Sequence, residues 1–93
     1  MKVRWAAPAE ADLDRLVVHI AKDSVEAAIR MQDRLLEATA DLAERPRRGR
    51  LGRIAKTREL VVPGTPYIAV YMVDPDTVWI LHVVHGAQDW PPK

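Results

Sequence analysis

Apolar residues in the first half of the chain recur with the spacing of a helix. Pro8 suits a first helical turn, where its missing N–H has no partner to lose. After it, the apolar positions follow the pattern i, i+3, i+4, i+7. These positions are Leu13, Leu16, Val17 and Ile20. Charged residues fall between them, so the pattern predicts one amphipathic helix that begins near Ala9 and ends near Lys22.

A second helical pattern follows a short polar link. Asp23 or Ser24 is the expected N-cap, and Glu26 would reach back to complete a capping box. The helix should end near Glu44, because the residue before Pro46 is driven out of the helical conformation. Its predicted apolar face contains Val25, Ala28, Ile29, Leu35, Leu36, Leu42 and Ala43. With so short a link, the two helices should form an antiparallel hairpin.

Strand patterns occupy the last third of the chain. Branched and aromatic residues fill 57–62, 67–73 and 77–85, and turn formers at 63–66 and 74–76 separate these runs. A shorter run at 2–5 could form one more strand. The order is therefore β-α-α-β-β-β. It predicts a single α+β domain over residues 1–93, with a helical hairpin packed on one face of a small antiparallel sheet.

The predicted sheet has more apolar surface than two helices can cover. The runs 67–73 and 77–85 are apolar at nearly every position, which is typical of strands covered on both faces. Tyr67, Ala69, Tyr71 and Val73, or else the alternate set, should then face something other than the helices. An exposed apolar patch favours a protein interface. Cover by loops and the C-terminal tail, or by a second copy of the chain, is the alternative.

Half of the positive charge is concentrated in fourteen residues. Residues 1–44 carry nine acids and six bases, whereas residues 45–58 carry seven bases and no acid. The seven are Arg45, Arg47, Arg48, Arg50, Arg53, Lys56 and Arg58. With its two glycines, the segment predicts a mobile basic loop, and its charge indicates a negatively charged partner.

Composition excludes several classes of protein and site. The chain has no cysteine, which rules out disulfides and thiolate metal sites. No apolar run approaches the ~20 residues of a membrane span, and the start lacks the apolar stretch of a leader. We therefore expect a cytoplasmic protein with no membrane partner. His19, His82 and His85 lack zinc-site spacing, so neither metal nor cofactor is expected. His82 should be packed or hydrogen-bonded on the face of Val78 and Ile80.

Five stretches of the chain, taken in order, match the pattern of a known protein family. They are APAEADLDRLVVHIA, LAERPRRGRLG, TRELVV, PYIAVYMV and ILHVVHGAQDWP, and they span nearly the whole chain. Their order and spacing resemble the RelE/ParE superfamily of bacterial toxins from type II toxin–antitoxin modules. The resemblance implies a growth inhibitor silenced, in a hetero-oligomer, by an acidic antitoxin encoded beside it. The expected antitoxin contacts are Tyr67, Ala69, Tyr71, Arg47, Arg48 and Arg50.

The superfamily divides by target, and the strand residues favour one branch. RelE-like members resemble ribosome-dependent mRNA nucleases, which carry an arginine beside the tyrosine of a YRLVY-like run. Here Ile68 takes that place, and the strand before it offers only Arg58, next to Glu59. ParE-like members bind DNA gyrase and have no established hydrolytic site. Arg58, together with His85 and Asp89 near the C-terminus, matches their pattern better.

The candidate target-binding residues are Arg58, His85, Asp89 and Trp90. Arg58 and His85 are also the catalytic candidates for a nuclease, since arginine stabilises phosphate charge and imidazole titrates near neutral pH. Each has a plainer interpretation, as a solvated or salt-bridged strand residue and as a structural histidine. Thr57 and residues 86–88 depart from the ParE-like pattern. Gyrase binding is therefore the prediction, and mRNA cleavage is the alternative.

Overall fold

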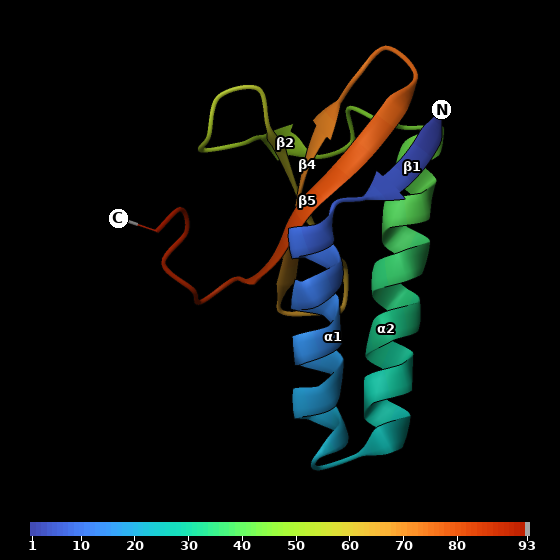
Figure 1. Ribbon diagram of the computed structural model, residues 1–93, viewed down its shortest axis with the longest axis vertical. Coiled ribbons are helices and arrows are strands. Elements are labelled where there is room, and N and C mark those ends of the chain that lie inside the picture. Colours follow the sequence, from blue (N-terminus) through green and yellow to red (C-terminus); the bar gives the residue numbers. More distant parts are fainter. Residues whose placement is uncertain (93) are drawn as a thin grey trace.

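A helical hairpin and a five-stranded sheet form the two layers of the computed structural model, which describes residues 1–92 (Figure 1). The elements are β1 (Lys2–Trp5), α1 (Ala7–Ala21), α2 (Val25–Ala40), the 3₁₀ turn η1 (Asp41–Ala43), β2 (Arg50–Leu51), β3 (Arg58–Val61), β4 (Tyr67–Val73) and β5 (Thr77–His85). This confirms the predicted α+β fold and adds one short strand, β2, within the basic segment.

The sheet is mixed, which corrects the prediction of an antiparallel one. Its strand order is β1-β5-β4-β3-β2. All neighbours pair antiparallel except β1 and β5, which run parallel from the Lys2–Thr77 pair to the Trp5–Ile80 pair. Two helices and three strands separate β1 from β5 in the chain. No local pattern specifies the edge or the direction in which the first strand joins across such a distance.

The helix ends follow the predicted local signals, with one shift. Ser24 is the N-cap of α2, and its Oγ accepts a hydrogen bond from the Ala27 N–H at 3.1 Å. Glu26 is therefore only the second helical residue, one position too early for the predicted capping box. η1 then carries the chain to the predicted stop before Pro46. No helix in the described part of the chain is long and apolar enough to span a membrane.

The main core lies between the sheet and the two helices. Its buried members are Ala9, Leu16, Leu35, Leu42, Leu60, Val62, Ala69, Tyr71, Val78, Ile80 and Val83. They come from both helices and from the three long strands, so each layer covers the apolar face of the other. Burial of apolar surface contributes about 25 cal/mol per Å², which makes this cluster the main source of stability.

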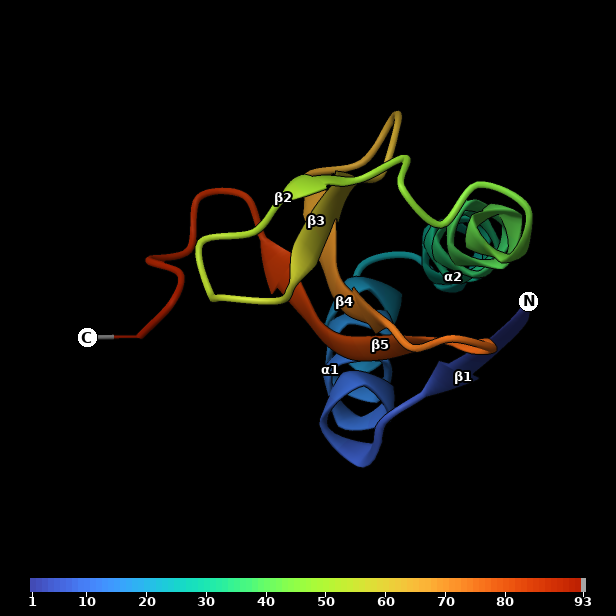
Figure 2. The same cartoon turned by 90° about the horizontal axis from the view of Figure 1, so that it is seen from above.

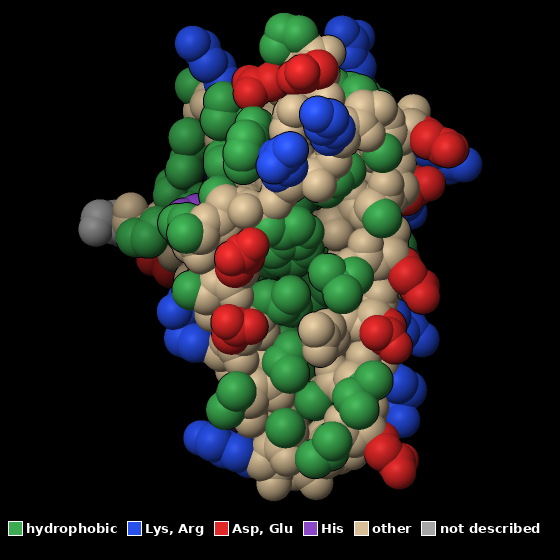
Figure 3. Space-filling view, turned by 45° about the vertical axis from the view of Figure 1, so that its right-hand side comes forward, with side chains coloured by type: hydrophobic (Ala, Val, Ile, Leu, Met, Phe, Trp, Pro, Cys, Tyr) green, Lys and Arg blue, Asp and Glu red, His purple; other side chains and the backbone are tan. Residues whose placement is uncertain are grey.

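The helical hairpin extends past the sheet, so part of its apolar surface remains exposed (Figure 1). Val18 and Val25 are each 62% exposed, Ile29 is 53% exposed and Leu36 is 40% exposed. Apolar side chains gather along the helices in Figure 3, with acidic side chains on both sides of them. Val25, Ile29 and Leu36 belong to the predicted apolar face of the second helix, and the structure leaves them exposed while Ala28, Leu35 and Leu42 are buried.

A second, smaller core lies on the sheet face opposite the helices. It consists of Ile68, Val70 and Val84. Trp90, from the C-terminal segment beyond β5, packs against this cluster, and Figure 2 shows that segment on the side away from both helices. Ala69 and Tyr71 instead have no exposed surface, and Tyr67 packs against the main core. Of the two sets that the sequence left open, the structure therefore places the alternate one, with Ile68 and Val70, on the outer face.

A bulge in β5 turns the end of this strand. Val70 lies opposite His82, whereas Tyr71 lies opposite Ile80, so Leu81 has no partner in the ladder. Ile80 consequently belongs to the main core, while His82 lies opposite a member of the outer cluster. This corrects the expectation that the two side chains share a face.

Candidate functional site

The basic segment 45–58 is tied to the sheet, which corrects the prediction of a mobile loop. β2 pairs antiparallel with β3. The Tyr71 hydroxyl donates to the Pro46 carbonyl at 2.7 Å and accepts from the Gly49 N–H at 2.8 Å. Arg58 Nη1 donates to the Gly49 carbonyl at 2.8 Å. Gly49 is required here, because a Cβ would come within 2.6 Å of the tyrosine oxygen.

Tyr71 is a structural link and not a proton-transfer group. Burial raises the pKa of its phenol above the ordinary value of 10.0, outweighing the opposing effects of the Gly49 N–H and of the Arg58 and Arg48 charges. The phenol therefore keeps its proton at physiological pH. That proton is the one donated to the Pro46 carbonyl.

Glu59 is a buried carboxylate on the outer face of β3 and is only 1% exposed. Its Oε1 accepts from Arg50 Nη2 at 3.1 Å, and its Oε2 accepts from the Arg53 N–H at 2.9 Å. Burial acts to raise its pKa, but these two hydrogen bonds and the charges of Arg53 and Arg50 together lower it below the ordinary 4.5. Glu59 is therefore ionised at neutral pH and organises the segment around it. An acid within an apolar strand, beside a basic segment, was the available sequence signal.

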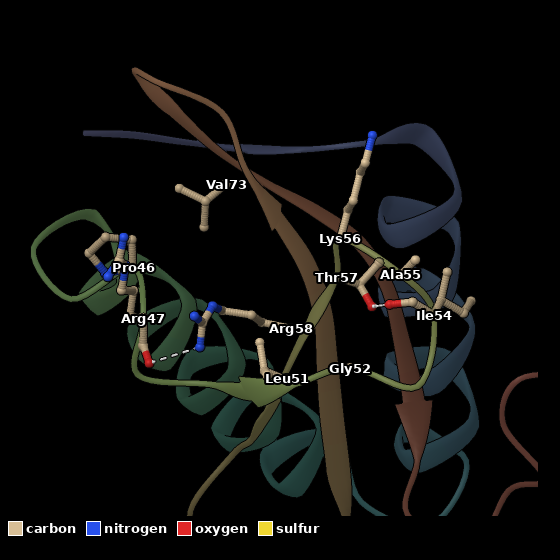
Figure 4. A pocket seen from close by; sticks show the side chains of 10 residues that line it. All are labelled: Pro46, Arg47, Leu51, Gly52, Ile54, Ala55, Lys56, Thr57, Arg58 and Val73. Atoms are coloured by element: carbon tan, nitrogen blue, oxygen red, sulfur yellow. Dashed lines mark hydrogen bonds between the residues drawn. The ribbon is translucent and has the colours of Figure 1, made fainter.

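The seven cations of the basic segment separate into two groups. Four lie within salt-bridge distance of a carboxylate: Arg45 and Arg48 with Asp41, Arg50 and Arg53 with Glu59. Arg47, Lys56 and Arg58 have no such partner within residues 1–92. These three border one pocket of about 550 Å³ (Figure 4). Its other lining residues are Pro46, Leu51, Gly52, Ile54, Ala55, Thr57 and Val73.

The C-terminal segment is fastened to the same structure from the other side. Arg53 Nη1 donates to the Trp90 carbonyl at 2.6 Å, so one arginine joins Glu59 to the tail. The Trp90 ring lies 5.3 Å from the His82 ring, centroid to centroid. Its indole Nε1 is buried without a hydrogen-bond partner among the described residues. An unmet buried donor costs about 1–3 kcal/mol, so this position of the indole ring lowers the stability of the tail.

His85 lies at the end of β5, beside a second cavity. Its Nδ1 accepts from the Ala87 N–H at 3.0 Å, and its ring meets the edge of Tyr67 at 5.5 Å between centroids. The cavity, of about 480 Å³, is also lined by Asp12, Arg15, His19, His82, Trp90 and Gln88. All three histidines therefore meet there, although no group of His, Asp and Glu side chains within residues 1–92 is arranged to hold a metal ion.

The structure divides the predicted target-binding residues between two places. Arg58 lies opposite Tyr71 of β4, whereas His85 lies opposite Tyr67. Four residues of extended chain separate these positions, which is roughly 13 Å. Arg58 and His85 therefore cannot act on one reacting atom as they stand. Asp89 is exposed, on the tail beside His85 and Trp90.

The fold and the basic segment match a described family of toxins. Residues 3–90 fit the family of the ParE toxin of type II toxin–antitoxin system, parDE. The chain belongs to the ParE toxin family. The match extends from β1 to Trp90, so it includes every lining residue of the pocket at Arg58.

Two relatives of this ParE-family chain are described as toxins, and one of them carries a RelE name. It is 44% identical over 90 residues to Y4kP of Sinorhizobium fredii, a candidate toxin, covering 97% of this chain and 93% of that protein. It is 42% identical over 87 residues to Toxin RelE2 of Caulobacter vibrioides, covering 94% and 97%. Sequence identity thus places the chain among the toxins. It does not distinguish between gyrase and the ribosome as the target.

Solved structures agree with this ParE-family fold. The chromosomal ParDE system of P. aeruginosa has a TM-score of 0.82 at 24% identity, covering 91% of this chain and 95% of that chain. The RelBE2 toxin–antitoxin complex of Mycobacterium tuberculosis has a TM-score of 0.69 at 29% identity, covering 90% and 95%. The first likeness, under 25% identical, shows the fold alone.

Proposed function

We propose that this ParE-family toxin inhibits growth by binding DNA gyrase in the cytoplasm and performs no cleavage itself. The observation that supports this best is the outer face of β4 and β5. Ile68, Val70 and Val84 form a buried apolar cluster there, covered by Trp90. Metal-independent RNA cleavage needs cations on the phosphate with an acid and a base beside it, and this apolar cluster supplies none of these groups.

The charges around this face support the same proposal. Glu59 lies opposite Val70 of this face, and the ionised carboxylate already binds Arg50 and Arg53. A phosphate would have to displace that carboxylate from its hydrogen bonds. The tail residues His85, Asp89 and Trp90 are the proposed gyrase contacts at one end of the sheet, with Arg58 at the other.

We propose further that an acidic antitoxin neutralises this toxin. The family is defined by toxins of type II toxin–antitoxin systems, and the M. tuberculosis structure is a toxin–antitoxin complex. Arg47, which is exposed and has no carboxylate partner within residues 1–92, suits an acidic partner best. Arg48 and Arg50 are proposed as weaker contacts, because Asp41 and Glu59 already hold them.

Ribosome-dependent mRNA cleavage is the second candidate function, and the cavity beside β5 favours it. This cavity brings three histidines, Tyr67, Asp12 and Arg15 together, which supplies proton-transfer groups and a cation. Arg15, however, is paired with Asp12, and the same carboxylate accepts from the Val83 N–H at 3.0 Å. These contacts also give Asp12 a structural role at the part of β5 that follows its pairing with β1.

Two assays on the purified toxin separate the two functions. We expect inhibition of supercoiling by DNA gyrase, together with intact mRNA in a translating extract whose mRNA ends are mapped. Arg58→Ala should weaken the inhibition by roughly tenfold, as for a hot-spot residue. Arg30→Ala, an exposed change on α2, should leave it unchanged. Cuts in the mRNA at codon positions, together with normal supercoiling, would contradict gyrase binding and support the nuclease function. Full inhibition by a stable Arg58→Ala protein would remove Arg58 from the contact surface.

A further inference from the structure

The three cations that have no carboxylate partner among residues 1–92 gather at the β2 end of the sheet. Arg47, Lys56 and Arg58 line the 550 Å³ pocket, and none of its ten lining residues is acidic. Arg58 is oriented by two backbone carbonyls, those of Gly49 at 2.8 Å and Arg47 at 3.4 Å. Carbonyls hold the guanidinium in place without neutralising it, so its charge remains available to an anion.

β2 leaves a strand edge open beside this pocket. In the described part of the chain it is the last strand of the sheet, and β3 is its one neighbour. An unpaired edge is a template for an added strand, because its free N–H and C=O groups accept an extended chain. Folded proteins usually cover or shorten such an edge. β2 is short, with two residues, yet the cations and the pocket lie directly beside it.

The pocket also exposes apolar side chains between its cations. Leu51 is 78% exposed, Ile54 is 40% exposed and Val73 is 39% exposed. Figure 4 shows Leu51 and Val73 on the Arg58 side of the pocket and Ile54 on the far loop. Binding of a nucleic acid backbone depends on cations at its phosphates and does not require exposed apolar side chains or an open strand edge. The combination therefore favours a polypeptide with alternating acidic and apolar residues over a nucleic acid.

The loop that closes the pocket is preformed. The Gly52 N–H donates to the Thr57 carbonyl at 2.8 Å, and Thr57 Oγ1 donates to the Ile54 carbonyl at 2.6 Å. A Cβ at position 52 would collide with the Thr57 hydroxyl. Lys56 has a φ of 66°, the left-handed conformation that such a tight loop requires. A preformed loop lowers the entropic cost of binding.

We propose that this pocket binds an extended acidic segment of a partner protein as a strand added beside β2. Its carboxylates pair with Arg47, Lys56 and Arg58, and its apolar side chains pack on Leu51 and Ile54. The antitoxin is the source of this segment, and in that respect the inference rests on the function proposed above. Since Arg58 also belongs to the proposed gyrase surface, occupation of the pocket masks part of the toxin from its target.

A labelled peptide titration tests the site without requiring gyrase. The probe is a synthetic peptide of about ten residues, the upper length of a common strand, with glutamate and valine alternating. A lysine–valine peptide and an oligouridylate of equal length are the comparisons. We expect only the acidic peptide to bind, with amide shifts in the NMR spectrum confined to residues 46–58 and Val73. Added salt should weaken the binding.

Two charge reversals complete the test. Lys56→Glu should lower the affinity for the acidic peptide by roughly tenfold, because it turns an attractive charge pair into a repulsive one. Arg30→Glu makes the same change of charge on exposed α2 and should leave the affinity unaltered. Equal binding of the lysine peptide, preferential binding of the oligouridylate, or shifts elsewhere would each overturn the inference. Failure of gyrase inhibition with intact peptide binding would count against the proposed target alone.

Discussion

Replacing Glu59 by alanine will lower the free energy of unfolding by about 2–3 kcal/mol, because hydrogen bonds to charged groups are worth that much. The change removes the acceptor of Arg50 Nη2 and of the Arg53 N–H. It leaves an arginine pair beside a cavity on the outer face of β3. Since Arg53 also donates to the Trp90 carbonyl, the tail should loosen as well. Chemical denaturation measures the loss, and tryptophan fluorescence reports the tail.

The contribution of Glu59 to the stability of the folded state should depend on pH. The folded state lowers the pKa of Glu59 below the ordinary 4.5, so its stabilisation is fully present above pH 4.5 and is lost as the pH falls through the folded value. Glu59→Gln should therefore be less stable than the original toxin at neutral pH, and the gap should close in acid. Glu37→Ala, on exposed α2, is the matched control. A gap that persists below the folded pKa would contradict an ionic role.

Replacing Tyr71 by phenylalanine will cost about 1–3 kcal/mol, although the ring that fills the core is retained. The lost hydroxyl is the partner of both the Pro46 carbonyl and the Gly49 N–H, which the change leaves unsatisfied beside a buried ring. Unlike Glu59, Tyr71 is not bonded to Arg53, the residue that holds the tail. We therefore expect faster amide hydrogen exchange at residues 46–50 and unchanged exchange at 84–90.

A comparison within the same strand sharpens the Tyr71 test. Tyr67→Phe removes the other tyrosine hydroxyl of β4, for which no hydrogen bond is recorded within residues 1–92, and should cost little. If Tyr71→Phe and Tyr67→Phe were equally stable, the hydroxyl link from β4 to the basic segment would be disproved. If Tyr71→Phe also weakens inhibition of the target, the link holds Arg58 in its working position through Gly49.

Tyr71→Phe and Glu59→Gln perturb opposite faces of the sheet. Together they therefore distinguish the pocket at Arg58 from the surface at the tail. Tyr71 supports the Arg47–Arg58 pocket from the helix side, and Glu59 supports Arg53 and the tail from the outer side. Loss of peptide binding in Tyr71→Phe with retention in Glu59→Gln would place the acidic segment at the pocket. The reverse result would move it toward the tail.

Much of this toxin follows from the sequence by itself, because local signals are enough. Turn formers at 63–66 and 74–76 bound β4 and β5, and the predicted runs 67–73 and 77–85 match those strands. Pro8 and Ser24 mark the helix starts, and Pro46 stops the second helical region. Each of these depends on backbone chemistry within a few residues. The order and spacing of such segments also led to the right superfamily.

Only the tertiary structure decided which side chains share a surface. The bulge at Leu81 separated His82 from the face of Ile80, and the register of β4 placed Tyr71 in the core and Ile68 outside. Both depend on pairing between strands, and a shift of one residue reverses every face. The partners of the charged side chains could not be predicted from the sequence for the same reason. Seven cations are equivalent in the sequence, and only folding brings Asp41 and Glu59 to four of them. The other three border one pocket and have no carboxylate partner within residues 1–92.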